Sequence, residues 1–181
     1  TVVGTVAASD QDAGEVLSYA ITAGNEGGAF AIDADTGQVT VQGALDFEGL
    51  NTYALTVNVT DGGLLSDSAA VSIGLMDVNE APTVGDQGFS VARNAAPGTV
   101  VGAVIASDPD AGDVLSYAFT AGNLGGAFAI GASGVITFQG ALDFEGLSPY
   151  ALTVQVTESG LLSDTAAVTI GVNDAPVAIA D

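Results

Sequence analysis

The chain has 181 residues, of which 22 are acidic and one is basic, so its formal net charge is −21, and it contains no histidine, cysteine or tryptophan. A Ser-His or Cys-His nucleophile pair is therefore excluded, as is a zinc site with the usual nitrogen and sulfur ligands. Oxygen ligands remain, and they suit hard cations such as calcium and magnesium. The acidic surface disfavours nucleic acid and anionic membranes as partners, and no apolar run approaches the roughly 20 residues of a membrane helix.

Two copies of one sequence make up the chain. Residues 1–32 match residues 99–130, and each stretch begins with TVVG and ends with GGAFAI. The pentapeptide VNEAP at 78–82 returns as VNDAP at 172–176. The repeats predict two domains of about 100 residues, residues 1–80 and residues 81–181, the second ending in a linker. The first copy has no match to FSVARNAAPG at 89–98, so we expect the first domain to lack its N-terminal strand in a piece of a longer protein.

Each copy is predicted to be all-β, and the fold to be two tandem immunoglobulin-like Greek-key β-sandwiches. In YALTVNV, residues 53–59, large apolar residues alternate with small or polar ones, which is the period of a half-buried strand. A second alternating strand follows, turn signals such as DADTG and TDGG lie between strands, and no segment has a sustained helical period. The side chains predicted to face the core are Tyr53, Leu55, Val57, Val59, Ala69, Val71 and Ile73, with Tyr150, Leu152, Val154, Val156, Ala166, Val168 and Ile170 in the second copy.

An acidic pair sits in the loop after the first strand that the two copies share, in SDQDAG and again in SDPDAG. A later loop carries one more acid, in TDGG and in TESG. One interpretation is turn residues whose side chains bond their own backbone, and the other is a set of cation ligands. The residues concerned are Asp10, Asp12 and Asp61 in the first copy and Asp108, Asp110 and Glu158 in the second.

The heptapeptide ALDFEGL occurs at 44–50 and again at 141–147. Its acids are Asp46 with Glu48, and Asp143 with Glu145, so each pair is two residues apart. If the heptapeptide is extended, both carboxylates of a pair face the same way. Two such charges about 4 Å apart repel by about 4 kcal/mol at an effective dielectric constant near 20. A solvated strand end is the alternative, but it leaves this repulsion unrelieved, whereas a cation removes it.

At this point the sequence resembles bacterial cadherin-like tandem repeats, which occur in large surface or secreted adhesin-type proteins. The motifs that carry the resemblance are DQDAG and DPDAG, FAIDADTGQVT, LDFE, YALTVNVTDGG and the linker DVNEAP, in the order of that family. The resemblance implies sandwiches joined end to end by calcium ions, which turn a flexible string into a stiff rod.

Carried over by position, the resemblance implies calcium ligands from three places at the junction inside this chain. Asp46 and Glu48 come from the base of the first domain, and the top of the second domain supplies Asp108, Asp110 and Glu158. The linker between the domains supplies Asp77, Asn79, Glu80 and the carbonyl of Ala81. The corresponding residues at the outer ends of the two domains are Asp10, Asp12, Asp61, Asp143, Glu145, Asn173 and Asp174.

Several residues depart from the pattern of that family. Arg93 stands in VARN where the family has an acid, near the lower end of the second domain, and its charge could replace a cation there. The second linker has Gly171 in place of the leading aspartate. We therefore expect fewer calcium ions at the lower junction. The asparagine that follows DxDxG in the family is absent, and Glu15 and Asp113 lie nearby.

Three classes of function follow from these observations. The leading hypothesis is a calcium-rigidified structural or adhesive repeat of a large extracellular bacterial protein, whose partners are neighbouring repeats, like subunits, or a cell-surface glycan or protein. The alternatives are a carbohydrate-binding module, for which Phe47 and Phe144 are the candidate platform, and a filament subunit that polymerises by exchange of edge strands. An enzyme is not expected, because two copies of one carboxylate pair on small sandwiches make an unusual active site.

Overall fold

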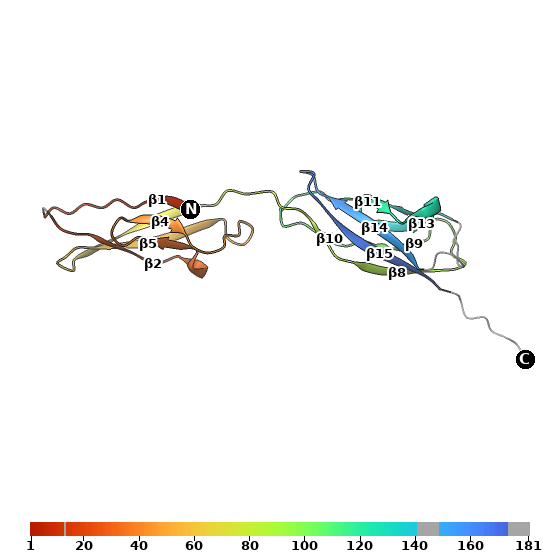
Figure 1. Ribbon diagram of the computed structural model, residues 1–181, viewed down its shortest axis with the longest axis horizontal. Coiled ribbons are helices and arrows are strands. Elements are labelled where there is room, and N and C mark those ends of the chain that lie inside the picture. Colours follow the sequence, from red (N-terminus) through yellow and green to blue (C-terminus); the bar gives the residue numbers. More distant parts are fainter. Residues whose placement is uncertain (13, 141–148, 174–181) are drawn as a thin grey trace, which may run out of the picture. The chain divides into compact units, whose positions relative to one another are not determined.

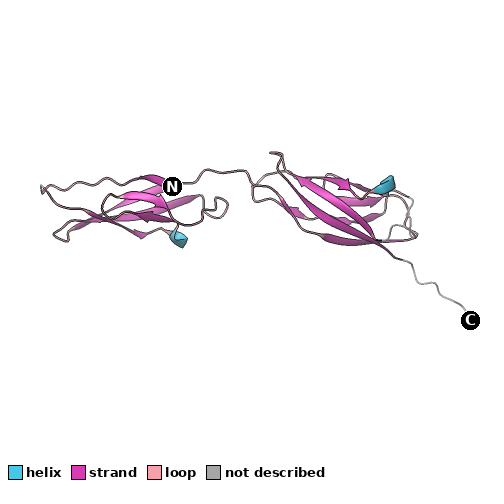
Figure 2. Cartoon of the chain, viewed as in Figure 1, coloured by secondary structure: helices cyan, strands magenta, loops and turns pink. Residues whose placement is uncertain are grey.

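The computed structural model describes residues 1–12, 14–140 and 149–173 and divides into two compact units, Thr1–Val78 and Asn79–Asp181 (Figure 1). Within the described residues the secondary structure is almost entirely strand (Figure 2). The helical segments there are two short 3-10 turns, η1 (Glu26–Gly28) and η2 (Leu124–Gly126), and no helix is long and apolar enough to cross a membrane. The chain is thus all-β, and the prediction of little helix is confirmed.

The second unit is a sandwich of two antiparallel-rich sheets. One sheet has the strand order β11-β14-β15-β8 and the other β12-β13-β9, while β10 and β7 form a separate short pair. Strand β15 pairs antiparallel with β14 on one edge and parallel with β8 on the other. The strands are β7 (Thr83–Val84), β8 (Gln87–Ala92), β9 (Val100–Ala103), β10 (Ala106–Ser107), β11 (Ser116–Ala121), β12 (Phe128–Ile130), β13 (Val135–Phe138), β14 (Tyr150–Thr157) and β15 (Ser163–Asn173).

The core of the second unit follows the predicted alternation. Every second residue of β14, from Tyr150 to Val156, is 3% exposed or less. On β15, Ala166, Val168 and Ile170 are equally hidden, with exposed fractions of 4%, 0% and 0%. The Tyr150 ring packs edge-on against Phe128 from the other sheet, with ring centroids 5.2 Å apart. Side chains from both sheets therefore close one apolar layer, as a sandwich requires.

The two sheets of the first unit have the same plan with one strand fewer, and among the described residues the first unit has no counterpart of the short β10-β7 pair. Its sheets have the orders β1-β4-β3 and β2-β5-β6, so among the described residues β6 pairs with β5 alone. This confirms the prediction that the first domain lacks its N-terminal strand. The strands are β1 (Val2–Thr5), β2 (Ser18–Ala23), β3 (Phe30–Ile32), β4 (Gln38–Val41), β5 (Thr52–Thr60) and β6 (Ser66–Gly74).

The unpaired edge of β6 changes the burial of its side chains. Leu55 and Val57 on β5 are fully buried, as predicted, but Ala69 on β6 is exposed and Val71 is only half-buried. Ala69 lies opposite the buried Val57 and therefore on the predicted face, but that face is not covered at this position. In the second unit, β8 pairs with β15 from Val168 to Asn173, and Val84 of β7 belongs to the same buried cluster as Ala166, whereas no described strand takes either place beside β6.

An open cavity of about 420 Å³ marks the uncovered part of the first unit. It is lined by the segment Val6–Asp10, by Leu17 and Val59, and by residues Leu65–Ala69 around the start of β6. In the second unit, Val84 of β7 lies between the corresponding segments: it pairs with Ala106 of β10 and is 8% exposed. The cavity thus corresponds to the place that β7 fills in the second copy.

A matched pair of substitutions tests this difference between the units. Ala166→Asp puts an unpaired carboxylate into a packed core and should lower the free energy of unfolding of the second unit by about 3 kcal/mol or more. Ala69→Asp adds the same charge at the exposed counterpart and should change the stability by about 0.5 kcal/mol or less. Denaturant unfolding followed by amide NMR separates the two units, and equal losses in the two variants would contradict the open edge of β6.

Candidate metal centre

Three carboxylates gather at one end of the second unit. Asp108, Asp110 and Asp113 lie in the loop between β10 and β11, and one carboxylate oxygen from each lies within 4.8 Å of the others. All three side chains are partly buried. The sequence predicted Asp108 and Asp110 as a pair, and the structure adds Asp113 as a third neighbour.

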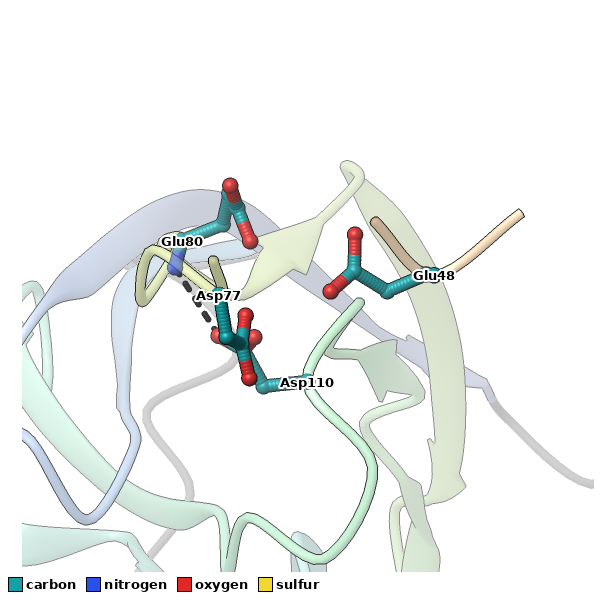
Figure 3. A group of neighbouring side chains, drawn as sticks. All are labelled: Glu48, Asp77, Glu80 and Asp110. Atoms are coloured by element: carbon teal, nitrogen blue, oxygen red, sulfur yellow. Dashed lines mark hydrogen bonds between the residues drawn. The ribbon is translucent and has the colours of Figure 1, made fainter. Parts of the chain in front are cut away.

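Each of these carboxylates has one oxygen held by a donor from the protein. The backbone N–H of Asp110 donates to Asp108 Oδ1 over 2.9 Å, and the hydroxyl of Ser159 donates to Asp113 Oδ1. The backbone N–H of Glu80 donates to Asp110 Oδ2 over 2.8 Å, the bond that is dashed in Figure 3. The donors come from the loop itself, from the β14–β15 loop and from the segment before β7, so three separate stretches fix the acids.

The remaining oxygen of each carboxylate is buried and has no hydrogen-bond partner. These atoms are Asp108 Oδ2, Asp110 Oδ1 and Asp113 Oδ2. A buried acceptor without a donor costs free energy, and the cost is larger when the group carries a charge. Hard oxygen atoms that are fixed and unsatisfied are the donor set that calcium takes up, since calcium accepts 6–8 oxygens in flexible geometry. The residues of this end therefore fit a calcium ion.

Glu158 lies at the same end of the second unit, as the first residue of the β14–β15 loop. Its side chain is 2% exposed, and its carboxylate accepts hydrogen bonds from the backbone N–H groups of Gly160 and Leu162 and from the side chain of Asn79, the last over 3.2 Å. Burial acts to raise the pKa of Glu158, but these hydrogen bonds outweigh it and hold the pKa below its ordinary value. Glu158 thus closes its own loop, in which Leu161 has a φ of 76°, and ties that loop to Asn79.

The segment before β7 brings further oxygens to this end of the second unit. A carboxylate oxygen of Glu80 lies within 4.8 Å of one from Asp110. Asn79, Glu80 and Ala81 are exposed, whereas Pro82 is fully buried and anchors the segment. The sequence prediction that Asn79 and Glu80 belong with Asp110 agrees with these contacts, while their role as ligands stays a prediction.

The corresponding end of the first unit is looser. Asp10 and Asp12 are exposed, and the backbone N–H of Asp12 donates to Asp10 Oδ1 over 2.7 Å. Asp61 Oδ1 accepts from the N–H of Leu65 over 2.8 Å, and Glu15 Oε2 accepts from the N–H of Gly62 over 3.1 Å. The bonds of Asp10 and Asp61 are local turn bonds and that of Glu15 joins two loops, so here the geometry resembles the turn interpretation more than a gathered set of ligands.

The other end of the first unit carries Asp46, Glu48 and Asp77. All three are exposed, and carboxylate oxygens of Glu48 and Asp77 lie within 4.8 Å of each other. The expectation that Asp46 and Glu48 lie on an extended strand is wrong, because residues 47–49 form a turn. Asp46 caps that turn: its Oδ1 accepts from the N–H of Gly49 over 3.0 Å, and its carbonyl accepts from the N–H of Leu50.

Several residues were predicted to lie at the far end of the second unit. Asp143, Glu145 and Asp174 lie outside the described residues, as does Phe144. Asn173 ends β15, and its carbonyl accepts a hydrogen bond from the backbone N–H of Arg93 over 2.9 Å. Arg93 is therefore at the lower end of the unit, where the sequence placed it.

Asp113 is the residue that sequence reasoning did not select. The signal was its spacing, because Asp113 comes directly after the glycine of DPDAG and the loop needs only one tight turn at Gly112, with φ of 108°, to bring it back toward Asp108.

The aromatic platform of a carbohydrate-binding module finds no support: among the described residues, the large hydrophobic side chains that are exposed include no aromatic one.

Comparison with known proteins agrees with this architecture. The Cadherin domain family matches residues 1–75 and 87–173, and the chain belongs to that family. It is 36% identical over 175 residues to the protocadherin-like wing polarity protein stan of Drosophila melanogaster, and the matched region covers 92% of this chain and 5% of that protein. It is 40% identical over 164 residues to protocadherin Fat 4 of Mus musculus, covering 86% of this chain and 3% of that protein.

Among solved structures, human protocadherin-24 EC1-2 matches with a TM-score of 0.71 and 26% identity, covering 95% of this chain and 88% of that one. The chain is thus a pair of cadherin repeats of the kind found in large adhesion proteins, and it spans only 5% and 3% of the two curated relatives named above. Those relatives are animal proteins, so the bacterial part of the sequence resemblance has no support here.

The hydrogen bonds of Glu158 should make the stability of the folded protein depend on pH. Because the pKa of Glu158 lies below its ordinary value of 4.5, the folded state favours the charged carboxylate. The stabilisation by this charge is complete above pH 4.5 and is lost as the pH falls through the lower pKa of the folded protein. Glu158→Gln should lower the melting temperature by a few degrees at pH 7 in chelator, and the difference from the wild type should shrink below pH about 4.5.

Thermal melts of both proteins between pH 7 and pH 3 measure this effect. Glu26→Gln, the same change at an exposed position, is the control and should leave the melting temperature unaltered. A difference between the Glu158 variant and the wild type that stays constant down to pH 3 would contradict a role for the charged form.

Proposed function

We propose that this chain is a calcium-rigidified spacer or adhesive segment of a large extracellular protein. The observation that carries the proposal is the set of three buried carboxylate oxygens without partners at the end of the second cadherin unit. Membership of the cadherin family adds the expectation that adjoining repeats share calcium at their junction. The proposal does not depend on a bacterial origin.

The resemblance and the structure together suggest the ligands. From the second unit they would be Asp108 and Asp110, with Asn79, Glu80 and the carbonyl of Ala81 from the segment before β7. From the first unit they would be Asp46, Glu48 and Asp77.

Glu158 would act by holding Asn79 in place, and as a ligand only through a lone pair that its three hydrogen bonds leave free. Asp10, Asp12 and Asp61 would serve a junction with a preceding repeat, and Asn173, Asp174, Asp143 and Glu145 one with a following repeat.

The mechanism is electrostatic. Without metal, carboxylates of the two units and of the segment that joins them repel one another, and no protein cation relieves them, because the only basic residue is Arg93. With calcium, the same groups become ligands of shared ions, and the junction stiffens. Extracellular calcium modules bind with dissociation constants of about 10⁻⁴ to 10⁻³ M, and a ligand at ten times its dissociation constant adds about 1.4 kcal/mol per site. We propose no catalytic role.

Calcium should therefore raise the melting temperature of the chain and narrow the distribution of angles between the two units. Thermal melts, small-angle scattering and single-molecule energy transfer between dyes on the two units measure these effects in millimolar calcium and in chelator. Asp110→Asn should weaken both responses, because it removes the charge of a central ligand. Asp35→Asn removes the same charge in an exposed turn of the first unit and should leave both responses intact.

Identical scattering profiles with calcium and with chelator would overturn the proposed function.

Exchange of edge strands is a second candidate function, and the open edge of β6 favours it. In the second unit, β7 pairs with β10, and the N–H of Val84 donates to Asp164 Oδ2 over 3.0 Å. Asp67 is the counterpart of Asp164: its Oδ1 accepts the N–H of Ser68 as Asp164 Oδ1 accepts the N–H of Thr165, both over 2.8 Å. The first unit therefore retains the acceptor arrangement that receives a strand in the second unit.

The occupant we propose for that edge is the segment at 175–181 of a second copy of the chain. It follows VND as residues 81–87, which contain β7, follow VNE. If the segment inserts, the mass of the assembly should grow with protein concentration, because a head-to-tail contact that does not close into a ring adds one copy after another. Light scattering coupled to gel filtration measures the mass, and a truncation after Asn173 is the control that should remain monomeric. A full-length chain whose mass is that of a monomer at every concentration would exclude this function.

A further inference from the structure

We propose that Asp113 is a third carboxylate ligand of a calcium site built within the second unit, and that the first unit has no equivalent of it. The inference rests on the proposed function only in taking calcium as the ion. It goes further in assigning a ligand outside the DxD pair, and in predicting that two near-identical repeats bind calcium with different strength at the same end.

The first step is the position of the Asp113 side chain. One of its oxygens takes the hydroxyl hydrogen of Ser159, which fixes the carboxylate against the β14–β15 loop. The other oxygen is buried without a donor, as is one oxygen each of Asp108 and Asp110. Asp46 and Asp61 of the first unit also have one oxygen held by a backbone N–H, but neither has a second oxygen that is buried without a partner.

The second step is the comparison with the first unit, where Glu15 stands at the position of Asp113. The Glu15 carboxylate accepts the backbone N–H of Gly62, which stands at the position of Ser159. The longer side chain thus reaches the neighbouring loop directly and is exposed there. Among the described residues of the first unit, no three acids come within 4.8 Å of one another.

The third step is the effect of charge. Three carboxylates that share a partly buried end repel one another, and this repulsion destabilises the metal-free protein. A divalent ion reverses the sign of the interaction, and its affinity rises with the number of charged ligands and the rigidity of the site. Asp113 therefore should weaken the metal-free fold and strengthen calcium binding, whereas a carboxylate that serves only the fold would do the opposite in chelator.

Calcium titration of the full chain by calorimetry tests the assignment with a matched pair of variants. Asp113→Asn keeps the size of the side chain and removes its charge, and it should raise the dissociation constant of one calcium site about tenfold. Glu15→Gln makes the same chemical change at the counterpart and should alter every dissociation constant less than twofold. In chelator, Asp113→Asn should melt at the same temperature as the wild type or at a higher one.

A measurement on the wild type needs no substitution. Manganese, a paramagnetic stand-in for calcium, should broaden the amide signals of residues 108–113 and 158–160 at lower concentration than those of residues 10–15 and 61–63. Equal broadening in both units, or an Asp113→Asn variant that binds calcium as tightly as the wild type, would overturn the assignment. So would a variant that melts lower in chelator and binds calcium normally, because Asp113 would then serve only the fold.

These outcomes are separate from a failure of the proposed function. If calcium binds at Asp113 but leaves the angles between the units unchanged, the site stands and the stiffening role falls. If calcium stiffens the chain and Asp113→Asn has no effect, the stiffening role stands and the assignment of Asp113 falls.

Discussion

Negative charge that the protein cannot neutralise by itself is the constraint on which this structure depends. With one arginine for 22 acidic residues, almost every carboxylate must be satisfied by backbone N–H groups, by hydroxyls, by water or by an added cation. At the end of the second unit the protein supplies one donor to each of three acids and leaves the other oxygen of each buried without one. The donors hold the carboxylates in place, and the oxygens left without a donor are of the type that fits a hard cation.

How far the sequence predicts the fold follows from which forces are local. The alternation in YALTVQV correctly predicts that Leu152 and Val154 are buried, because the period of two that places side chains on one face of a strand is visible in the sequence. Ala69 shows the limit: its pattern equals that of Ala166, but its burial depends on a strand paired through long-range contacts. The conformation at the ends of the sandwich was harder to predict. Asp46 lies in a turn that is closed by a hydrogen bond from Gly49 to its carboxylate, and such a turn overrides the alternation of a strand.

The candidate site was predictable in its residue types and only partly in its members. Asp108 and Asp110 were found because two acids two apart in a loop are a recognisable pair, and Asp113 was missed because its approach depends on the Ser159 hydroxyl from a loop more than forty residues away. Glu158 was expected as a ligand in place of an aspartate, and its carboxylate accepts the N–H groups of Gly160 and Leu162. Asp61, its counterpart, accepts the N–H of Leu65 in the same way, so the position of an acid in this loop does not by itself identify a ligand.

The sandwich and the candidate metal centre are joined through the segment before β7, so the stability of one bears on the other. Pro82 is fully buried, and the N–H of Val84 donates to Asp164, a bond that lowers the pKa of that aspartate together with one from Thr165. These contacts fix the register of the chain just before β7, and that register is what brings the N–H of Glu80 to Asp110 and the amide of Asn79 to Glu158. An ion that bound the acids would therefore also hold the first residues of the second unit against its core. Conversely, a unit whose leading segment is not in place loses two of the donors that shape the site, the N–H of Glu80 and the side-chain amide of Asn79.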